Sequence, residues 1–596
     1  MEPKTYNRCI KVRSLRWDFF KLAVGCSMIA KVRCDVMNQI LNVPCPLQQY
    51  CAGSNESMKG DPFGLMRCTV FKMTRQLTLT NGSNVGAISD APYLTDLFAL
   101  SSEWIEIMVP CRPPYMDASY EKSQWTQPRW LHNFAMLFVM DSPPMVLTAS
   151  FSKRLFEPVD AASIYAFRLM FGLVMFWEVW RFVGSDWIGE YYVDRPFLFK
   201  YYGFSWVKAW PGDGMYIHFA VVGVLALCMA FGFLYRSAAW LFFLGFSYWF
   251  LLDQTRYLNH LYLVCLISFL LACIPANRGL SLDARLRSGL MSQTLPAWCL
   301  WVLRFQVCVV YFYAGIAKLN VDWLRLEPIR TWLARRNDYP LIGPFLETEV
   351  AAAFFGYGGL VFDLTIAPLL LWKRTRVWAF VVCIFFHATN KMLFNIGIFP
   401  FLAIALTTVM LSPDWPRRLK LFVKQYPANS PSRAVAAPTG FVRGMVVAFL
   451  TIYISIQLLF PLRHFLYPGY VSWTEEGHRF AWHMKLREKR AMARFFATDP
   501  RTGETQEVDT TQWLCKEQRK RVGRFSDMSL QFAHFLADEL GEGDGRLEIR
   551  VQSIARVNGR MSQLIFDPNV DLAAEKRSLA HAEWILPLRY DLPAVD

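Results

Sequence analysis

The stretch that decides the fold is Tyr311-Phe-Tyr-Ala-Gly-Ile-Ala-Lys-Leu-Asn-Val-Asp-Trp323. It ends an apolar run that begins at Trp298 and is interrupted only by Arg304 and Gln306. A run of about 20 apolar residues is long enough to cross a bilayer as a helix. The run places Lys318 at its end, where an ionisable side chain is costly and therefore usually functional. The alternative is that the lysine amine simply extends to the lipid headgroups.

The composition indicates a membrane protein. Of the 596 residues, 54% are hydrophobic, and the mean hydropathy is +0.22. Soluble domains contain about 45–50% apolar residues. The formal net charge is +15, but the basic residues lie mostly between apolar runs, as membrane topology requires. We find no zinc-finger spacing and no RNA-binding aromatic signature. The expected partner is therefore the lipid bilayer, and no nucleic acid is expected.

Hydrophobic segments predict a mainly α, polytopic helical membrane bundle. The segments are residues 164–183, 215–235, 237–252, 258–274, 298–317, 351–371, 377–388, 392–411 and 445–461. Several are short or interrupted, so we expect eight or nine spans. The predicted transmembrane domain covers residues 148–465.

The distribution of basic residues predicts the orientation. Lysine and arginine cluster before the first segment and after the second, fourth, sixth and eighth segments. All these loops lie on the cytoplasmic side if nine spans alternate, although the arginines of residues 320–350 weaken the rule there. The chain after Pro461 is then periplasmic or lumenal. Asn259, His260 and Lys318 would lie at the boundary facing that compartment.

Residues 466–596 are predicted to form an extramembrane α+β domain. Alternating polarity over 546–554 predicts a half-buried strand, and a turn at 499–504 joins predicted strands at 492–497 and 504–508. A helix is expected over 528–540, capped by Ser526 or Asp527 and followed by Gly541.

Residues 1–147 differ from the rest because they have no sustained helical or alternating period. We interpret them as a poorly ordered extension, or as the product of a mis-assigned start with Met140 or Met145 as the working start. No function is assigned to them.

Four strings of sequence resemble one family. They are Leu251-Leu-Asp-Gln-Thr-Arg-Tyr-Leu-Asn-His260, Tyr313-Ala-Gly-Ile-Ala-Lys-Leu-Asn-Val-Asp-Trp323, Gly469-Tyr-Val-Ser-Trp-Thr474 and Gln563-Leu-Ile-Phe-Asp-Pro-Asn-Val-Asp571. In this order and spacing they resemble the vitamin K-dependent γ-glutamyl carboxylases, members of the horizontally transferred transmembrane domain proteins. The resemblance is to a bacterial-type member.

The resemblance implies a reaction. Reduced vitamin K, a naphthohydroquinone, is deprotonated and reacts with O₂ to give the epoxide. The oxidation supplies the base strength that removes a glutamate γ-proton, and CO₂ adds to the carbanion. The implied partner is a glutamate-rich protein or peptide, and no metal is required.

The resemblance also assigns roles to residues. Lys318 matches the base that takes the hydroquinone proton, and removal from water favours the neutral amine that such a base requires. His260 matches a histidine near the carbanion and CO₂ step, and Asn259 would orient its ring or bind the quinol. His387 and His464 match family histidines expected to bind the cofactor, unless they only hydrogen-bond between helices.

The substrate region carries a departure from the family pattern. It comprises Trp473, Thr474, Glu475, Glu476, His478 and Trp482. His478 stands where mammalian-type carboxylases have a tyrosine implicated in glutamate handling, which puts peptide carboxylation in doubt. The alternative for the two tryptophans is packing in an interfacial aromatic belt.

Three functions therefore stay open from sequence. The first is a membrane enzyme that couples hydroquinone epoxidation to glutamate carboxylation. The second is a quinol epoxidase or oxidase without peptide carboxylation. The third is a non-enzymatic membrane anchor or transport module, although we find no inverted repeat with broken helices.

Overall fold

The computed structural model describes residues 153–340, 342–394, 396–419, 439–541 and 546–593. These residues belong to one compact unit, 149–596. The predictions for residues 1–147, including a start at Met140 or Met145, lie outside the described residues.

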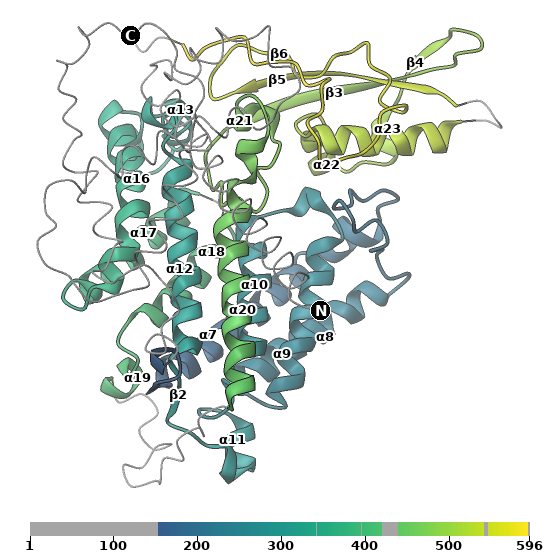
Figure 1. Cartoon of the computed structure of the whole chain (residues 1–596). Helices are drawn as coiled ribbons and strands as arrows, with labels where there is room; N and C mark the ends of the chain where they lie inside the picture. Colours follow the sequence, from purple (N-terminus) through teal and green to yellow (C-terminus); the bar gives the residue numbers. More distant parts are fainter. Residues whose placement is uncertain (1–152, 341, 395, 420–438, 542–545, 594–596) are drawn as a thin grey trace, which may run out of the picture. The chain divides into compact units, whose positions relative to one another are not determined.

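Each predicted hydrophobic segment overlaps one helix of a bundle (Figure 1). The helices are α7 (Ala162–Gly184), α8 (Gly214–Phe231), α9 (Tyr235–Leu251), α10 (Asn259–Cys273), α12 (Ala297–Ala317), α16 (Glu349–Leu371), α17 (Arg376–Leu393), α18 (Phe399–Thr407) and α20 (Gly440–Leu459). In the described part of the chain, five segments are long and apolar enough to cross a membrane: α7, α8, α12, α16 and the segment that α20 begins. This supports an integral membrane protein, whereas eight or nine crossings stay a prediction.

The predicted boundary between the seventh and eighth segments is wrong. Helix α17 continues through residues 389–391 and ends at Leu393, and α18 begins only at Phe399. Gly397 between them has a φ of +59°, a conformation that favours glycine. Pro400 then lies in the first turn of α18, where its missing N–H costs nothing.

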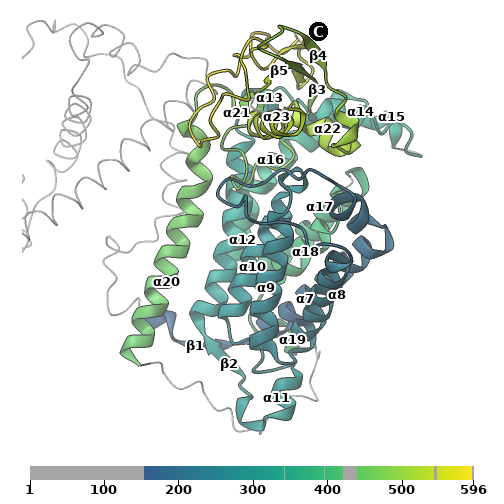
Figure 2. The same cartoon turned by 90° about the vertical axis from the view of Figure 1, so that its right-hand side faces the viewer.

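Close packing and aromatic contacts hold the bundle together. A Cβ on Gly172 of α7 would lie 2.6 Å from the carbonyl oxygen of Ala226 of α8, so only glycine permits this approach. The rings of Phe182, Phe219 and Trp249 join α7, α8 and α9, with centroids 4.5 to 5.5 Å apart. Helix α20 buries few residues and stands at one edge of the bundle (Figure 2).

The C-terminal region forms an antiparallel sheet in the order β4-β3-β5-β6. Its strands are β3 (Lys489–Thr498), β4 (Thr505–Glu507), β5 (Glu548–Val557) and β6 (Gln563–Leu564). Alternate residues of β5 are buried, from Ile549 to Val557, which confirms the predicted half-buried strand. Helices α22 (Lys516–Val522) and α23 (Ser526–Leu540) pack on the sheet (Figure 1).

The predicted cap of α23 is wrong. Phe525 is the N-cap residue and makes no side-chain cap hydrogen bond, so Ser526 and Asp527 lie inside the helix. The Asp527 carboxylate instead accepts hydrogen bonds from Arg577 at 2.6 Å and from Gln254 at 2.7 Å. Asp527 thus joins the C-terminal region to the loop before α10.

Candidate active site

Lys318 lies at the C-terminal end of α12 with its amine turned into the protein. Its Nζ donates hydrogen bonds to Asp363 Oδ2 at 2.6 Å and to the Ala314 carbonyl at 3.2 Å. The amine also lies 5.2 Å from the centroid of the Trp323 ring. Only 6% of the Lys318 surface is exposed. This burial argues against a lysine that extends to the headgroups.

The residues around Lys318 explain its position. A Cβ on Gly315 would lie 2.7 Å from Leu364 Cδ2, so the glycine lets α12 approach α16 closely where Asp363 faces the lysine. After the helix, the Asn320 side chain caps the short helix α13 (Val321–Leu324) by accepting from Trp323 N at 3.0 Å.

Asp322 ties this stretch to the C-terminal region. Its two carboxylate oxygens each accept a hydrogen bond from the Arg560 guanidinium at 2.7 Å, and Asn558 Nδ2 donates at 2.7 Å. Asp322 is 1% exposed and Arg560 8% exposed. A paired, planar geometry of this kind fixes orientation as well as distance. The segment that carries Lys318 is therefore anchored on both sides of the predicted membrane boundary.

A cavity of about 790 Å³ lies beside the lysine. It brings together residues far apart in sequence: Lys318, Asn259, His260 and His387 from the bundle, and Glu475 and His478 from the C-terminal region. The predicted residues His464, Trp473, Thr474, Glu476 and Trp482 are not among its lining residues.

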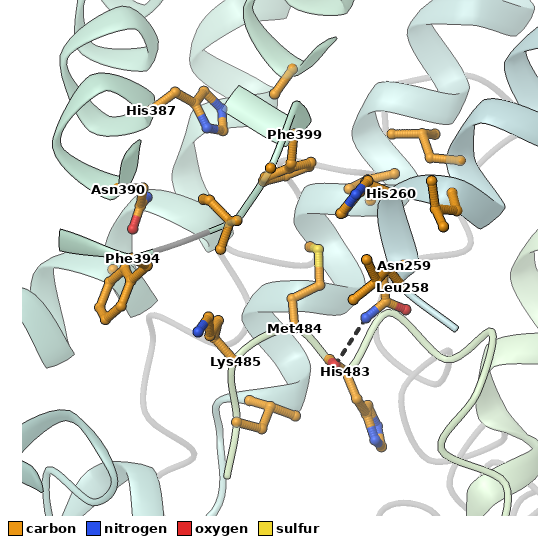
Figure 3. Close-up of a pocket in the computed structure, with 18 of the residues that line it drawn as sticks. Leu258, Asn259, His260, His387, Asn390, Phe394, Phe399, His483, Met484 and Lys485 are labelled. Atoms are coloured by element: carbon orange, nitrogen blue, oxygen red, sulfur yellow. Dashed lines mark hydrogen bonds between the residues drawn. The ribbon is translucent and has the colours of Figure 1, made fainter. Parts of the chain in front are cut away.

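Two histidines face the cavity from different helices (Figure 3). The Phe399 ring lies between them, with its centroid 6.0 Å from that of His260 and 5.6 Å from that of His387. His387 Nε2 is hydrogen-bonded to the Tyr311 hydroxyl at 2.9 Å. The other ring nitrogen, Nδ1, is buried without a partner among the described residues. A buried polar atom of this kind calls for an explanation, such as a missing ligand.

Asn259 bonds to two other segments of the chain, and its predicted role in orienting the His260 ring or binding the quinol stays a prediction. Its Nδ2 donates to the His483 carbonyl at 3.0 Å (Figure 3), and its Oδ1 accepts from the Tyr257 hydroxyl at 2.9 Å. Asn259 thereby joins the start of α10 to the loop after α21 (Val471–Thr474).

A basic group holds Glu475 at the other end of the cavity. Arg487 donates two hydrogen bonds to the Glu475 carboxylate, and Lys489 Nζ lies 3.8 Å from it. Burial lowers the pKa of Lys489 to about 7. Burial also holds the pKa of His478 well below its usual range, so its neutral ring donates from Nδ1 to the Glu475 carbonyl at 2.5 Å.

Two family models match the chain, one over the bundle and one over the C-terminal region. Residues 156–415 match the HTTM domain, and residues 442–591 match the lumenal domain of the vitamin K-dependent gamma-carboxylase. The chain belongs to the vitamin K-dependent gamma-carboxylase family. His260, Lys318 and His387 fall in the first match, and Glu475 and His478 in the second. No solved structure matches the chain.

The predicted substrate-region residues that do not line the cavity are packed inside the protein. Trp473 packs in the C-terminal core and donates from its indole nitrogen to the Leu586 carbonyl at 2.7 Å, and Trp482 packs in the bundle core. Both are 1% exposed, so the aromatic-belt alternative is wrong. Thr474 is buried as well.

Glu476 and His464 also bond to the protein. The Glu476 carboxylate is hydrogen-bonded to His581 Nδ1 at 2.7 Å and accepts from Ala582 N at 3.0 Å. His464 Nδ1 donates to the Pro461 carbonyl at 2.9 Å, and its ring centroid lies 4.6 Å from that of His483. Their predicted roles in substrate and cofactor binding stay predictions.

Asp363 is a candidate functional residue that the sequence patterns above do not predict. It is buried in α16 and pairs with Lys318, and both side chains are less than 10% exposed. An acidic residue within an apolar membrane-spanning segment usually has a function, and this is the sequence signal by which Asp363 could be found. Among the described residues, no three His, Cys, Asp or Glu side chains group as metal ligands.

Proposed function

We propose that this chain is an integral-membrane, vitamin K-dependent carboxylase that couples hydroquinone epoxidation by O₂ to γ-proton abstraction from glutamate and addition of CO₂. The observation that carries the proposal is the buried Lys318–Asp363 pair, which lines the same cavity as His260 and His387. Membership of the carboxylase family supports an enzyme of this type.

The lining of the cavity supports binding of a reduced naphthoquinone with a lipid tail. Aromatic side chains such as Phe362, Phe394 and Phe399 line it, as expected for a flat apolar ring. The lining also includes Phe354, Val382 and Phe385, which are 64%, 49% and 70% exposed on α16 and α17. An apolar tail would leave the cavity between these two helices, toward lipid.

With a quinol in the cavity, the polar side chains that line it would each have a role in the reaction. Vitamin K hydroquinone, when bound, supplies by its oxidation the base strength that no side chain has. Lys318 takes the proton of a quinol hydroxyl on its amine, and the Asp363 carboxylate stabilises the ammonium that forms. The free Nδ1 of His387 would hold a quinol oxygen. His260 faces the cavity where the carbanion would meet CO₂.

The orientation forms part of the proposal. We place the C-terminal domain on the periplasmic or lumenal side. The small sheet of β1 (Pro158–Asp160) and β2 (Thr294–Pro296) lies at the opposite end of the bundle (Figure 2). Arg417 of the basic segment α19 (Trp415–Arg418) pairs with Asp160 of this sheet at 3.0 Å. Basic segments on the cytoplasmic side agree with the positive-inside rule.

One observation favours the second candidate, epoxidation without peptide carboxylation. At the cavity wall, the Glu475 carboxylate already accepts a hydrogen bond from Arg487 and lies near Lys489. A substrate glutamate would have to displace it or bind elsewhere.

One assay separates the two candidates. Membranes containing the protein are incubated with vitamin K hydroquinone, with and without a glutamate peptide and labelled bicarbonate. Epoxide together with fixed label supports coupled carboxylation, and epoxide alone supports the second candidate. The absence of both would contradict the proposed enzyme and leave an anchor or transport module.

A further inference from the structure

Four arginines line the end of the cavity at the C-terminal region. They come from three separate segments: Arg256 from the turn before α10, Arg479 from the loop after α21, and Arg521 and Arg524 from the end of α22 and the turn that follows it. We call them the arginine cluster. All four are half-buried, and none forms an ion pair with a carboxylate among the described residues.

Members of the arginine cluster lie close enough to repel each other. Burial, together with the neighbouring charges of Arg256 and Arg524, lowers the pKa of Arg521 to about 10. The buried Nε of Arg524 has no hydrogen-bond partner among the described residues. Like charges held close together in a partly desolvated site destabilise the protein unless a bound anion neutralises them.

The nearby carboxylates are engaged elsewhere. Asp253 accepts from the backbone and side chain of Thr255. Glu517 pairs with Lys520 at 2.7 Å, and Glu475 is held by Arg487. The guanidinium groups keep donors in the planar arrangement that matches a carboxylate.

Tyr191 and Phe525 support two members without neutralising them. The Arg256 guanidinium lies 3.6 Å from the centroid of Tyr191, and that of Arg479 lies 4.9 Å from the centroid of Phe525. Stacking of this kind holds a guanidinium in place and leaves its edge for hydrogen bonds.

We infer that the arginine cluster binds side-chain carboxylates of an acidic peptide, next to the glutamate that enters the cavity. The inference rests on the proposed function for the choice of peptide. The four residues line the interior of a cavity that reaches Lys318 and His260. A flexible acidic peptide can enter such a cavity, whereas the flat surface of an anionic membrane cannot.

The test measures binding rather than turnover. The full chain in detergent is titrated against a fluorescent peptide containing several glutamates, and against the same peptide with glutamines. The variant Arg521→Gln/Arg524→Gln is compared with Arg519→Gln, which changes an exposed arginine of the same helix outside the cavity. The double variant should bind the glutamate peptide about tenfold more weakly or worse, and Arg519→Gln should bind within about twofold of wild type.

A lysine variant and a competition with lipid vesicles complete the experiment. If the glutamine variants do not fold, Arg521→Lys/Arg524→Lys keeps the charges but loses the planar fork, and about threefold weaker binding is expected. Equal affinity for the glutamate and glutamine peptides, or unchanged affinity in the substituted proteins, would overturn the inference. Competition by phosphatidylserine vesicles would assign the cluster to lipid and would also overturn it.

Epoxide formation without peptide is measured in the same preparations. If epoxide forms normally in the double variant while peptide binding is unchanged, only the arginine inference fails. If peptide binding depends on the arginines but wild type forms no epoxide, only the proposed function fails.

Discussion

Replacement of Asp363 by asparagine should slow hydroquinone oxidation while leaving the amine of Lys318 in the cavity. Asparagine keeps the shape and one acceptor oxygen but removes the charge 2.6 Å from Lys318 Nζ. Both side chains are less than 10% exposed, so water screens their interaction little. A hydrogen bond to a charged partner contributes about 1.5–3 kcal/mol. Loss of this stabilisation in the transition state predicts a fall of about 10- to 150-fold in the rate of epoxide formation.

The assay is the initial rate of epoxide formation in membranes without peptide. Glu349→Gln is the matched control, because Glu349 is an exposed acid at the start of the same helix and pairs with Arg330. Its epoxidation rate should stay within about twofold of wild type, as expected for an exposed pair.

The stability of a second variant checks the same reasoning. Where Lys318 is protonated, loss of Asp363 strands a buried charge, which costs about 3–5 kcal/mol, whereas the neutral amine needed for the reaction carries no such cost. Lys318→Met/Asp363→Leu removes both charges, so it should unfold at a higher temperature than Asp363→Asn while forming no epoxide. A wild-type epoxidation rate in Asp363→Asn would refute the role given to this carboxylate.

Two other buried groups give further predictions. Asp322→Ala should lower the free energy of unfolding by about 3–5 kcal/mol because it leaves the buried Arg560 charge without a partner. Adding Arg560→Met to this variant should restore part of the lost stability. Additive losses in a double-mutant cycle would contradict the coupling between the two residues. The pKa of Lys489 is about 7 in the folded chain, against about 10.4 for an unperturbed lysine, so the unfolded chain binds more protons between these values. Stability of the wild type should therefore rise relative to Lys489→Met from about pH 7 to pH 9, and parallel unfolding midpoints across this range would contradict the lowered pKa.

Local sequence patterns predicted the helices and the lysine because they depend on nearby residues. The apolar run that ends at Lys318 specifies a helix with an amine at its end, and the alternation around Ile549 specifies a strand. The partner of the lysine is different, because Asp363 is 45 positions away and meets it only where Gly315 lets two helices approach. Asp527 likewise bonds to residues distant in sequence instead of capping α23, which local capping rules cannot predict.

The substrate region shows why a motif does not give the direction of its side chains. Glu475, Gly477, Phe480 and Trp482 all have positive φ values, so the chain turns repeatedly and follows neither a helical nor a strand period. Glu475 and His478 therefore line the cavity, while neighbouring members of the motif are buried in two separate cores or pair with other residues.

The central claim is that the buried amine of Lys318 starts the reaction by taking a proton from the hydroquinone. The most direct measurement is epoxide formed per amount of folded protein in Lys318→Ala and in Lys391→Ala, which removes an exposed lysine of α17 outside the cavity. We expect no epoxide from Lys318→Ala and wild-type formation from Lys391→Ala. Full turnover by folded Lys318→Ala would contradict the claim.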